Sequence, residues 1–234
     1  MERPRYPLPK DLRKGSCTEL SILAQARGLG LVAGLEVITQ RGILWFSERL
    51  PDRDGTPTTS WILTDSARRN AQARRLDGQP WSVIGGKKAR TLRGWEASWP
   101  IGLADVREHN RPSVLLVEGG PDLLSAATVA WTYASGGLDD IGFACMAGAA
   151  NRIPSDALTT FAGRRVIIPF HDDVEGLKAA ARWESQLNSS GADAISFSLK
   201  GLTKQDGTPA KDLNDAIGAP ELRELVEALF LVPS

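Results

Sequence analysis

The stretch 114–122, Val-Leu-Leu-Val-Glu-Gly-Gly-Pro-Asp, places the strongest constraint on the fold. Its four apolar residues are typical of a strand buried on both faces, and Glu118 stands where that strand ends. Gly119 and Gly120 allow a tight turn, and Pro121 suits the first turn of a helix. Open α/β sheets bind ligands at the carboxyl ends of their strands. The sequence therefore predicts a sheet with Glu118 at its functional edge.

Alternating strands and helices continue this pattern to the end of the chain. Strands are predicted at 114–117, 142–146, 165–170 and 194–199, and helices at 122–134, from Ser155, at 174–187 and at 221–230. Strands that alternate with helices pair in parallel and carry helices on both faces. We therefore expect residues 112–234 to form an α/β domain with a mainly parallel sheet flanked by helices and a C-terminal helix.

The first half of the chain has a different composition. Residues 1–14 are expected to form a basic arm, and residues 15–111 a small, basic, Trp-rich α+β domain. The spacing of Ser16 and Glu19 is that of a helix-capping box and predicts the first helix. Apolar stretches on either side of a turn sequence then indicate a β-hairpin or a small antiparallel sheet within residues 42–64.

The two halves carry opposite charge. Residues 1–111 contain 19 Lys and Arg against 12 Asp and Glu, a net charge of +7, whereas residues 112–234 contain 9 against 16, a net charge of −7. This asymmetry indicates an anionic partner held by the first half and metal-dependent chemistry in the second. The alternative is that the opposite charges only attract the two halves to each other.

Basic residues and tryptophans alternate in the first half. A single-stranded nucleic acid binds to such a surface because cations contact its phosphates and aromatic rings stack on its bases. The alternative, which we favour for most of the individual tryptophans, is that the rings fill the core and the arginines form a solvated rim. The candidate contacts to nucleic acid are Arg74, Arg75, Lys87 and Lys88, and the tryptophans are Trp45, Trp61, Trp81, Trp95 and Trp99.

A second acidic cluster, residues 171–176, follows the strand predicted at 165–170 and has the sequence His-Asp-Asp-Val-Glu-Gly. If its strand neighbours the one that ends at Glu118, carboxylates from both clusters lie close enough to hold a divalent cation. Such an ion stabilises charge during phosphoryl transfer. For each cluster alone, the alternative is a helix N-cap or a favourable charge on the helix dipole.

Together these motifs resemble the TOPRIM domain, the metal-binding module of primases, topoisomerases and some nucleases. Its first motif, an apolar strand followed by Glu-Gly-x-x-Asp, is matched at 118–122, and its second, Asp-x-Asp-x-x-Gly, aligns with 171–176. The run 211–215, Lys-Asp-Leu-Asn-Asp, is similar to the Lys-Asp-x-x-Asp run that follows the last TOPRIM strand in primases. The resemblance covers residues 112–218.

The resemblance implies roles for individual residues. Glu118 would be the acid/base or metal-shaping carboxylate and Asp173 a magnesium ligand, and both are candidate catalytic residues. The implied metal site comprises Glu118, His171, Asp173 and Asp212, with Asp215 as a further candidate, and Gly119, Asp122 and Gly176 would be structural.

His171 stands where the motif has its first aspartate. The expected cofactor is Mg²⁺ or Mn²⁺. Neutral imidazole is a poor ligand for Mg²⁺ and a better one for Mn²⁺ or Zn²⁺, so the alternatives are weak metal binding, a preference for another ion, or use of Asp172 after a local shift. Strand alternation directs Asp172 away from the side of its neighbours, so its replacement of the missing aspartate stays open. The alternative is that His171 caps a helix or supports the ligands in a site that no longer catalyses.

The first half also resembles the segment that precedes TOPRIM in primase-like proteins of phages and plasmids, most recognisably at 74–78 and 99–102. The two resemblances imply a primase-like nucleotidyltransferase of DNA replication that makes short primers on single-stranded DNA. The expected partners are single-stranded DNA, nucleoside triphosphates and a separate helicase or replication protein. The alternatives are a non-catalytic TOPRIM protein that binds single strands and a TOPRIM nuclease.

Other protein classes are excluded by what the sequence lacks. Cys17 and Cys145 are the two cysteines, too few for a cysteine-built zinc finger, and they indicate a reducing cytoplasm. No Gly-x-x-x-x-Gly-Lys-Ser/Thr loop occurs, so ATP-driven unwinding is excluded within this chain. No apolar run approaches the roughly 18 residues of a membrane span, and we expect a cytoplasmic protein without membrane contact.

Overall fold

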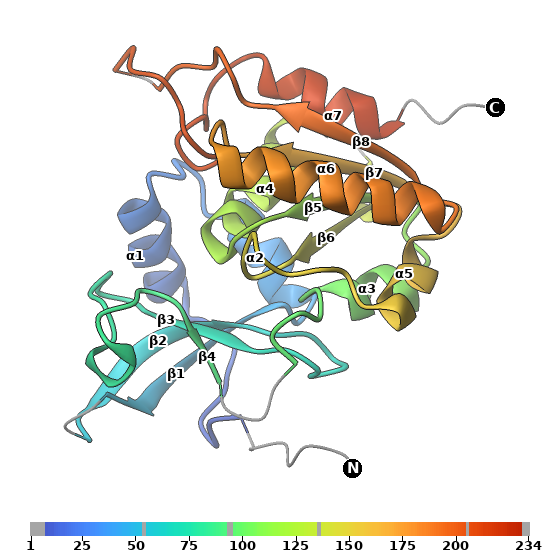
Figure 1. Ribbon diagram of the computed structural model, residues 1–234. Coiled ribbons are helices and arrows are strands. Elements are labelled where there is room, and N and C mark those ends of the chain that lie inside the picture. The colour runs from blue at the N-terminus through green and yellow to red at the C-terminus, as the bar shows by residue number, and fades with distance from the viewer. Residues whose placement is uncertain (1–7, 53–54, 93–95, 135–136, 205, 231–234) are drawn as a thin grey trace.

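The computed structural model describes residues 8–52, 55–92, 96–134, 137–204 and 206–230. They form an antiparallel sheet and a parallel sheet, each of four strands, with helices packed around both (Figure 1). Residues 1–7 of the predicted basic arm lie outside the described part of the chain.

The first half of the chain builds the antiparallel sheet. Its elements are α1 (Cys17–Arg27), α2 (Ala33–Gln40), β1 (Leu44–Pro51), β2 (Pro57–Leu63), β3 (Gln72–Arg75), the 3₁₀ helix η1 (Ser82–Ile84), β4 (Arg90–Thr91) and α3 (Leu103–Glu108). The strand order is β1-β2-β3-β4, and Trp45 pairs with Ile62 across β1 and β2, which confirms the predicted hairpin. Helix α1 begins after Ser16, with both hydrogen bonds of the capping box to Glu19 formed, as its sequence predicts.

The second half builds the parallel sheet. Its elements are β5 (Ser113–Val117), α4 (Gly120–Tyr133), η2 (Leu138–Asp140), β6 (Ile141–Cys145), α5 (Ser155–Phe161), β7 (Arg165–Phe170), α6 (Val174–Ser189), β8 (Asp193–Ser198) and α7 (Leu222–Phe230). The strand order is β6-β5-β7-β8, and every neighbouring pair is parallel. The prediction of a parallel sheet flanked by helices is confirmed.

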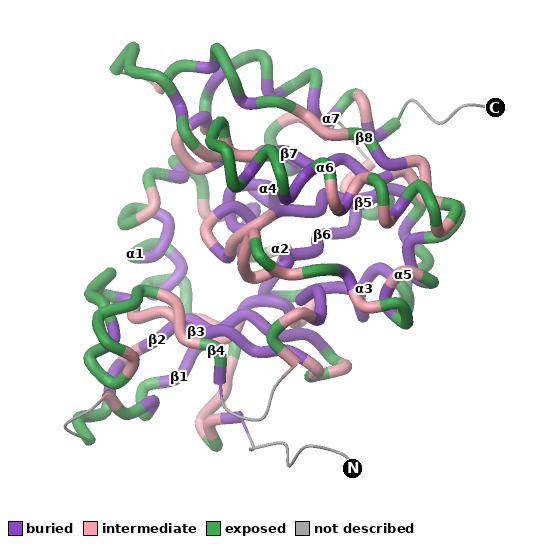
Figure 2. The backbone as a smooth tube through the Cα atoms, viewed as in Figure 1, coloured by how far each residue is buried: buried purple, intermediate pink, exposed green. Residues whose placement is uncertain are grey.

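Side chains alternate along β5 between the two faces of this sheet. Leu115 and Val117 pack in the core cluster that contains α4 and α7, whereas Val114 and Leu116 pack with Trp183 of α6. Both faces are therefore covered, and Figure 2 shows the buried backbone running through β5, β6 and β7. This explains the uninterrupted apolar run of β5, because a strand covered on both faces has no solvated side.

One core joins the two halves of the chain. Leu35 of α2 and Trp61 of β2 belong to the same buried cluster as Leu124 of α4. A Cβ atom on Gly34 would lie 2.6 Å from the backbone of Thr128, so α2 and α4 approach as closely as a glycine permits. Helix α3, although it precedes the predicted boundary, packs against β6 and α5. The boundary between residues 111 and 112 remains a prediction.

The helices α2 and α3 were not expected from the sequence. Each lacks a side-chain hydrogen bond at its N-terminus, so the signal that predicts α1 is missing there. Both helices depend on tertiary packing against the parallel-sheet layer. In the described residues, no helix combines the length and apolarity that would let it cross a membrane.

The tryptophans of the first half mostly fill the core. Trp61, Trp81 and Trp99 are 3%, 0% and 5% exposed, which supports the core interpretation for these three. Trp45 is half-buried and donates its indole N–H to the backbone oxygen of Gly42, 2.8 Å away. Trp95 lies outside the described residues.

Candidate metal centre and adjacent basic pocket

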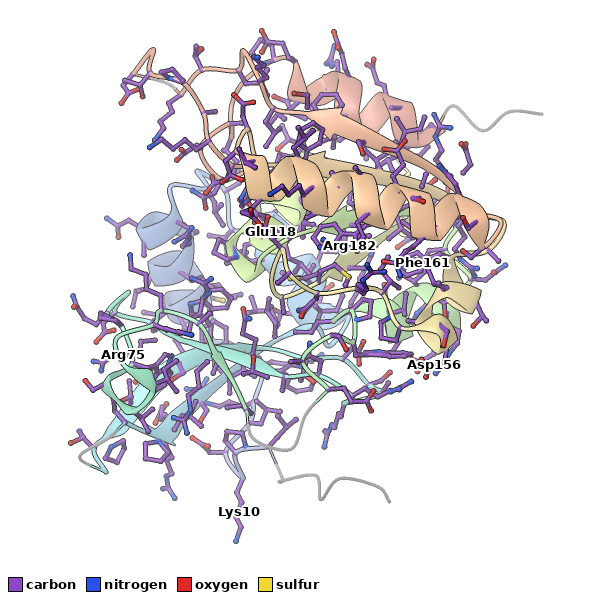
Figure 3. The ribbon with its side chains drawn as sticks, viewed as in Figure 1. Lys10, Arg75, Glu118, Asp156, Phe161 and Arg182 are labelled. Carbon is purple, nitrogen blue, oxygen red and sulfur yellow. The ribbon has the colours of Figure 1, made fainter. Side chains whose placement is uncertain are left out.

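The two acidic clusters follow neighbouring strands. Strand β5 pairs with β7, so Glu118 at the end of β5 and His171 after β7 lie at the same edge of the parallel sheet. Figure 3 shows Glu118 close to the end of α6 at which that helix begins. His171 Nδ1 lies 3.5 Å from Glu118 Oε2, and His171 Nε2 lies 3.3 Å from Asp122 Oδ2. The predicted proximity of the two clusters is confirmed by these distances.

Three side chains converge at this edge. Asp122, His171 and Asp212 each offer one ligand atom, and these atoms all lie within 4.8 Å of one another. Asp212 reaches the group from the segment that follows β8. Its Oδ1 atom accepts the backbone N–H of Asp215 at 2.8 Å, and Asp215 is held in turn by an ion pair with Lys204 at 2.9 Å.

The two carboxylate oxygens of Asp122 have different surroundings. Its Oδ2 atom accepts the backbone N–H of Gly119 at 3.1 Å, a bond that closes the turn before α4. The residue is 4% exposed, and its Oδ1 atom is buried without a hydrogen-bond partner among the described residues. A buried carboxylate oxygen is strongly disfavoured unless a donor or a cation satisfies it.

The electrostatics of the cluster are dominated by burial and by the crowding of carboxylates. Burial raises the pKa of Glu118, with Asp122 and Asp173 adding to the effect and His171 opposing it. Burial also raises the pKa of Asp212, and the charges of Asp122 and Asp215 add to it.

The imidazole of His171 compensates part of this negative charge. Its hydrogen bond to Asp122 and the nearby charges of Glu118 and Asp212 raise its pKa to about 9. A pKa above neutrality favours the protonated ring at pH 7. A metal ion requires a neutral imidazole, so metal binding at this residue displaces a proton.

Asp173 occupies the N-cap of α6. Its Oδ1 atom accepts the backbone N–H of Gly176 at 2.7 Å. A Cβ atom on Gly176 would lie 2.6 Å from the backbone oxygen of His171, so the motif needs glycine for this close approach. The geometry shows the capping role that was the alternative for this cluster, while the role of Asp173 as a metal ligand remains a prediction. Asp172 is exposed.

A basic pocket of about 170 Å³ lies between α1 and β3. It is lined by Arg27, Arg74, Arg75 and Lys88 together with Trp61. The sequence predicted three of these cations as nucleic-acid contacts, whereas Lys87 is not among the described lining residues. Arg27 was missed because an arginine in the last turn of a helix is expected simply to favour the helix dipole.

The charges in this pocket are incompletely compensated. The Nε atoms of Arg27 and Arg74 are buried and have no hydrogen-bond partner within the described ranges. Burial, and next the charge of Arg27, lower the pKa of Arg74, whose guanidinium lies 5.9 Å from the ring centre of Trp61. Arg75 differs, because Asp52 and Asp77 pair with it at 3.0 and 2.6 Å. The pocket thus has the character of an anion site.

The acidic cluster and the basic pocket lie on contacting elements. A Cβ atom on Gly120 would lie 3.1 Å from Leu63, 3.3 Å from Trp61 and 3.4 Å from Gln72, so the start of α4 rests on β2 and β3. The charge of Asp122, two residues further along α4, acts on Arg74.

Comparison with known proteins gives structural likeness at low identity. No protein-family model matches the chain, and no curated protein matches it. A DNA primase domain from Pseudomonas aeruginosa is similar with a TM-score of 0.44 and 18% identity over 80% of this chain and 55% of that one. The zinc-binding and RNA polymerase domains of the Aquifex aeolicus primase are similar with a TM-score of 0.49 and 14% identity over 91% of this chain and 60% of that one. The chain therefore spans little more than half the length of these primase structures.

Proposed function

We propose that the chain is a primase-like nucleotidyltransferase that uses a divalent metal ion to make short primers on single-stranded DNA. The observation that carries this proposal is the convergence of Asp122, His171 and Asp212 at one edge of a parallel sheet, next to a basic pocket in which the Nε atoms of Arg27 and Arg74 have no partner among the described residues. The order of the three TOPRIM-like motifs along the chain supports the same assignment.

The donor set fits a divalent cation. Asp122, His171 and Asp212 would hold it, with Glu118 beside them. The Oδ1 atom of Asp122, which has no hydrogen-bond partner among the described residues, is available as a ligand atom. When bound, such an ion neutralises charge on phosphate oxygens. Carboxylates suit both Mg²⁺ and Mn²⁺, whereas imidazole shifts the preference towards Mn²⁺.

The other residues bind phosphate and transfer a proton. Arg27, Arg74 and Lys88 hold phosphates of the nucleotide or the template in the basic pocket. Glu118, made more basic by burial, accepts the proton that the 3′-hydroxyl loses when its oxygen bonds to the α-phosphorus. The bond from the α-phosphorus to its bridging oxygen breaks at the same time, and pyrophosphate leaves. Catalysis rests on positioning and charge neutralisation.

The test is a product assay with single-stranded DNA and labelled ribonucleotides, run separately with Mg²⁺ and Mn²⁺. We expect short oligonucleotides from the unmodified protein and none from Glu118→Gln, with the circular dichroism spectrum of the variant unchanged. Glu36→Gln, at an exposed position on α2, is the matched control and should retain full synthesis. Undiminished synthesis by Glu118→Gln would remove Glu118 from the site.

One observation favours a second function, that of a non-catalytic protein that binds single-stranded DNA. The protonated His171 bridges Glu118 and Asp122 and so neutralises part of the acidic cluster. Under this alternative the unmodified protein binds single-stranded DNA but makes no product with either metal, and His171→Asp creates the activity. A nuclease would instead cleave DNA without any triphosphate.

A further inference from the structure

A second and larger cavity lies at the opposite edge of the parallel sheet. Its volume is about 930 Å³, within the usual range for small-molecule sites, and its lining includes Gln40, Arg41, Asp105, His109, Arg111 and Trp131. Arg111 precedes β5, whereas Glu118 follows it. Because β5 has five residues with a rise of about 3.3 Å each, the cavity and the acidic cluster lie roughly 17 Å apart along the strand.

This cavity is lined by two arginines, Arg41 and Arg111, and by two carboxylates, those of Asp105 and Asp139. Arg111 Nε and Nη2 donate to Asp105 at 2.7 and 3.1 Å and so use both carboxylate oxygens. Arg41 Nη1 lies 3.7 Å from the same carboxylate. Asp105 and Arg111 are buried, and Arg41 is partly buried. The other acidic neighbour of Arg41 is Asp139, which is fully exposed, so its pairing at 3.7 Å is screened by water. Two guanidinium groups therefore share one buried carboxylate.

Arg41 has donors to spare for a ligand. It donates to the backbone oxygens of Leu138 and Ile141, both at 2.7 Å. A guanidinium carries five N–H groups, and these two bonds to backbone oxygens of the described residues use only two of them. The remaining N–H groups are available to a ligand. Burial and the charge of Arg111 lower the pKa of Arg41, as expected for a cation whose charge is incompletely balanced. An anion in the cavity would supply the missing charge.

An aromatic surface stands beside this charge. Trp131 on α4 is 48% exposed, unlike the buried Trp61, Trp81 and Trp99. The side chain of His109 is 58% exposed, and its Nδ1 atom lies 3.1 Å from Asp105. An accessible indole next to a buried cation suits a ligand that has an aromatic ring at one end and negative charge at the other.

We propose that this cavity binds a nucleoside phosphate, with the base stacked on Trp131 and the phosphate held by Arg41 and His109. The site is separate from the proposed transfer site and requires no divalent ion. The same chemistry is offered by a free mononucleotide and by the 5′-phosphorylated end of a DNA strand, and the experiment compares the two.

The experiment is isothermal titration calorimetry on the full chain in EDTA, with adenosine monophosphate, adenosine, and a 5′-phosphorylated tetranucleotide as separate probes. We expect Trp131→Ala to weaken the binding of adenosine monophosphate by about fivefold or more, because stacking on an aromatic ring is lost. Trp131→Phe should retain affinity within about threefold of the unmodified protein. Leu31→Ala, another exposed apolar position outside the cavity, should leave affinity unchanged.

The phosphate interaction is tested by the probes. Adenosine should bind at least tenfold more weakly than its monophosphate. If the 5′-phosphorylated tetranucleotide binds more weakly than adenosine monophosphate, the free nucleotide is identified as the ligand. The proposal would be overturned if the unmodified protein and Trp131→Ala bound adenosine monophosphate with equal affinity, or if the unmodified protein did not bind it. Binding lost in Arg74→Ala but retained in Trp131→Ala would place the nucleotide in the basic pocket. Neither result depends on primer synthesis, so failure here is distinguishable from failure of the proposed function.

Discussion

Asp122 combines a structural bond with an unsatisfied oxygen. Its Oδ2 atom closes the turn at Gly119, while its Oδ1 atom has no partner in the part of the chain that the structure describes. An unsatisfied buried acceptor costs about 1–3 kcal/mol. The crowding of Glu118 and Asp212 adds repulsion, which the protonated His171 offsets in part. A cation bound between these carboxylates, as we propose, would satisfy the Oδ1 atom of Asp122 and reduce the repulsion among them.

Asp173 and Asp212 should respond differently to removal of their charge. Asparagine caps a helix about as well as aspartate, so Asp173→Asn should keep the bond from Gly176 and bind Mn²⁺ within about threefold of the unmodified protein. Asp212→Asn removes one of the three converging ligands and should weaken Mn²⁺ binding by about tenfold or more. Titration of Mn²⁺ followed by electron paramagnetic resonance measures both.

Asp172→Asn, an exposed position in the same loop, is the matched control and should bind Mn²⁺ normally. An equally large loss in Asp173→Asn and Asp212→Asn would place Asp173 among the ligands, as the motif predicts.

The sequence predicted which clusters meet but not all the residues that take part. Glu118 and His171 each follow an apolar strand, and the rules of parallel sheets bring such positions to one edge, where the structure places them 3.5 Å apart. Asp122 and Asp173 both stand at helix N-termini, and local sequence does not distinguish a cap from a ligand. Arg27 joins the basic pocket through the packing of α1 against the antiparallel sheet, which leaves no local signal.

At the scale of elements, α1 shows how a local signal becomes stability. The carboxylate of Glu19 accepts hydrogen bonds from the backbone N–H and the hydroxyl of Ser16. It also accepts two hydrogen bonds from the guanidinium of Arg13, at 2.7 and 2.9 Å. These hydrogen bonds, of which those from Arg13 have the largest effect, lower the pKa of Glu19 from its ordinary value of 4.5 to about 2. The capping box was readable from four consecutive residues, whereas the contribution of Arg13 required the fold.

Loss of this carboxylate should have a pH-dependent cost. Because the folded-state pKa lies below the unfolded value, the ionised Glu19 stabilises the fold fully above about pH 4.5, and this contribution is lost as the pH falls towards 2. Arg13 is 39% exposed, so solvent screening limits the difference between the unmodified protein and Glu19→Gln to about 1 kcal/mol at pH 7. Urea unfolding at pH 7, 4.5 and 3 should show the difference shrinking.

Glu36→Gln on the exposed face of α2 is the control and should change the free energy of unfolding by less than about 0.5 kcal/mol at each pH. A difference for Glu19→Gln that is the same at pH 7 and pH 3 would show that its carboxylate charge is not the stabilising group.

For the whole molecule, the sequence indicated two domains of opposite charge, while the structure shows a core that both halves share. The sequence shows net charge and hydrophobic periodicity, but it does not show which helices and strands of the two halves pack against each other. Leu35 and Trp61 from the first half pack in the same cluster as Leu124, and Gly34 brings α2 onto the backbone of α4. A core built from both halves favours unfolding as one cooperative unit.

We therefore expect a single transition in urea, with the same midpoint by tryptophan fluorescence and by circular dichroism at 222 nm. Five of the seven tryptophans lie in the first half, whereas the long helices α4 and α6 lie in the second. Fluorescence therefore reports mainly on the first half and circular dichroism mainly on the second. Leu124→Ala removes a fully buried side chain and should lower the free energy of unfolding by about 2–5 kcal/mol. Both midpoints should fall together, and Leu31→Ala should move neither. A fall in the circular dichroism midpoint alone would show that the halves unfold independently, as a domain boundary after residue 111 predicts.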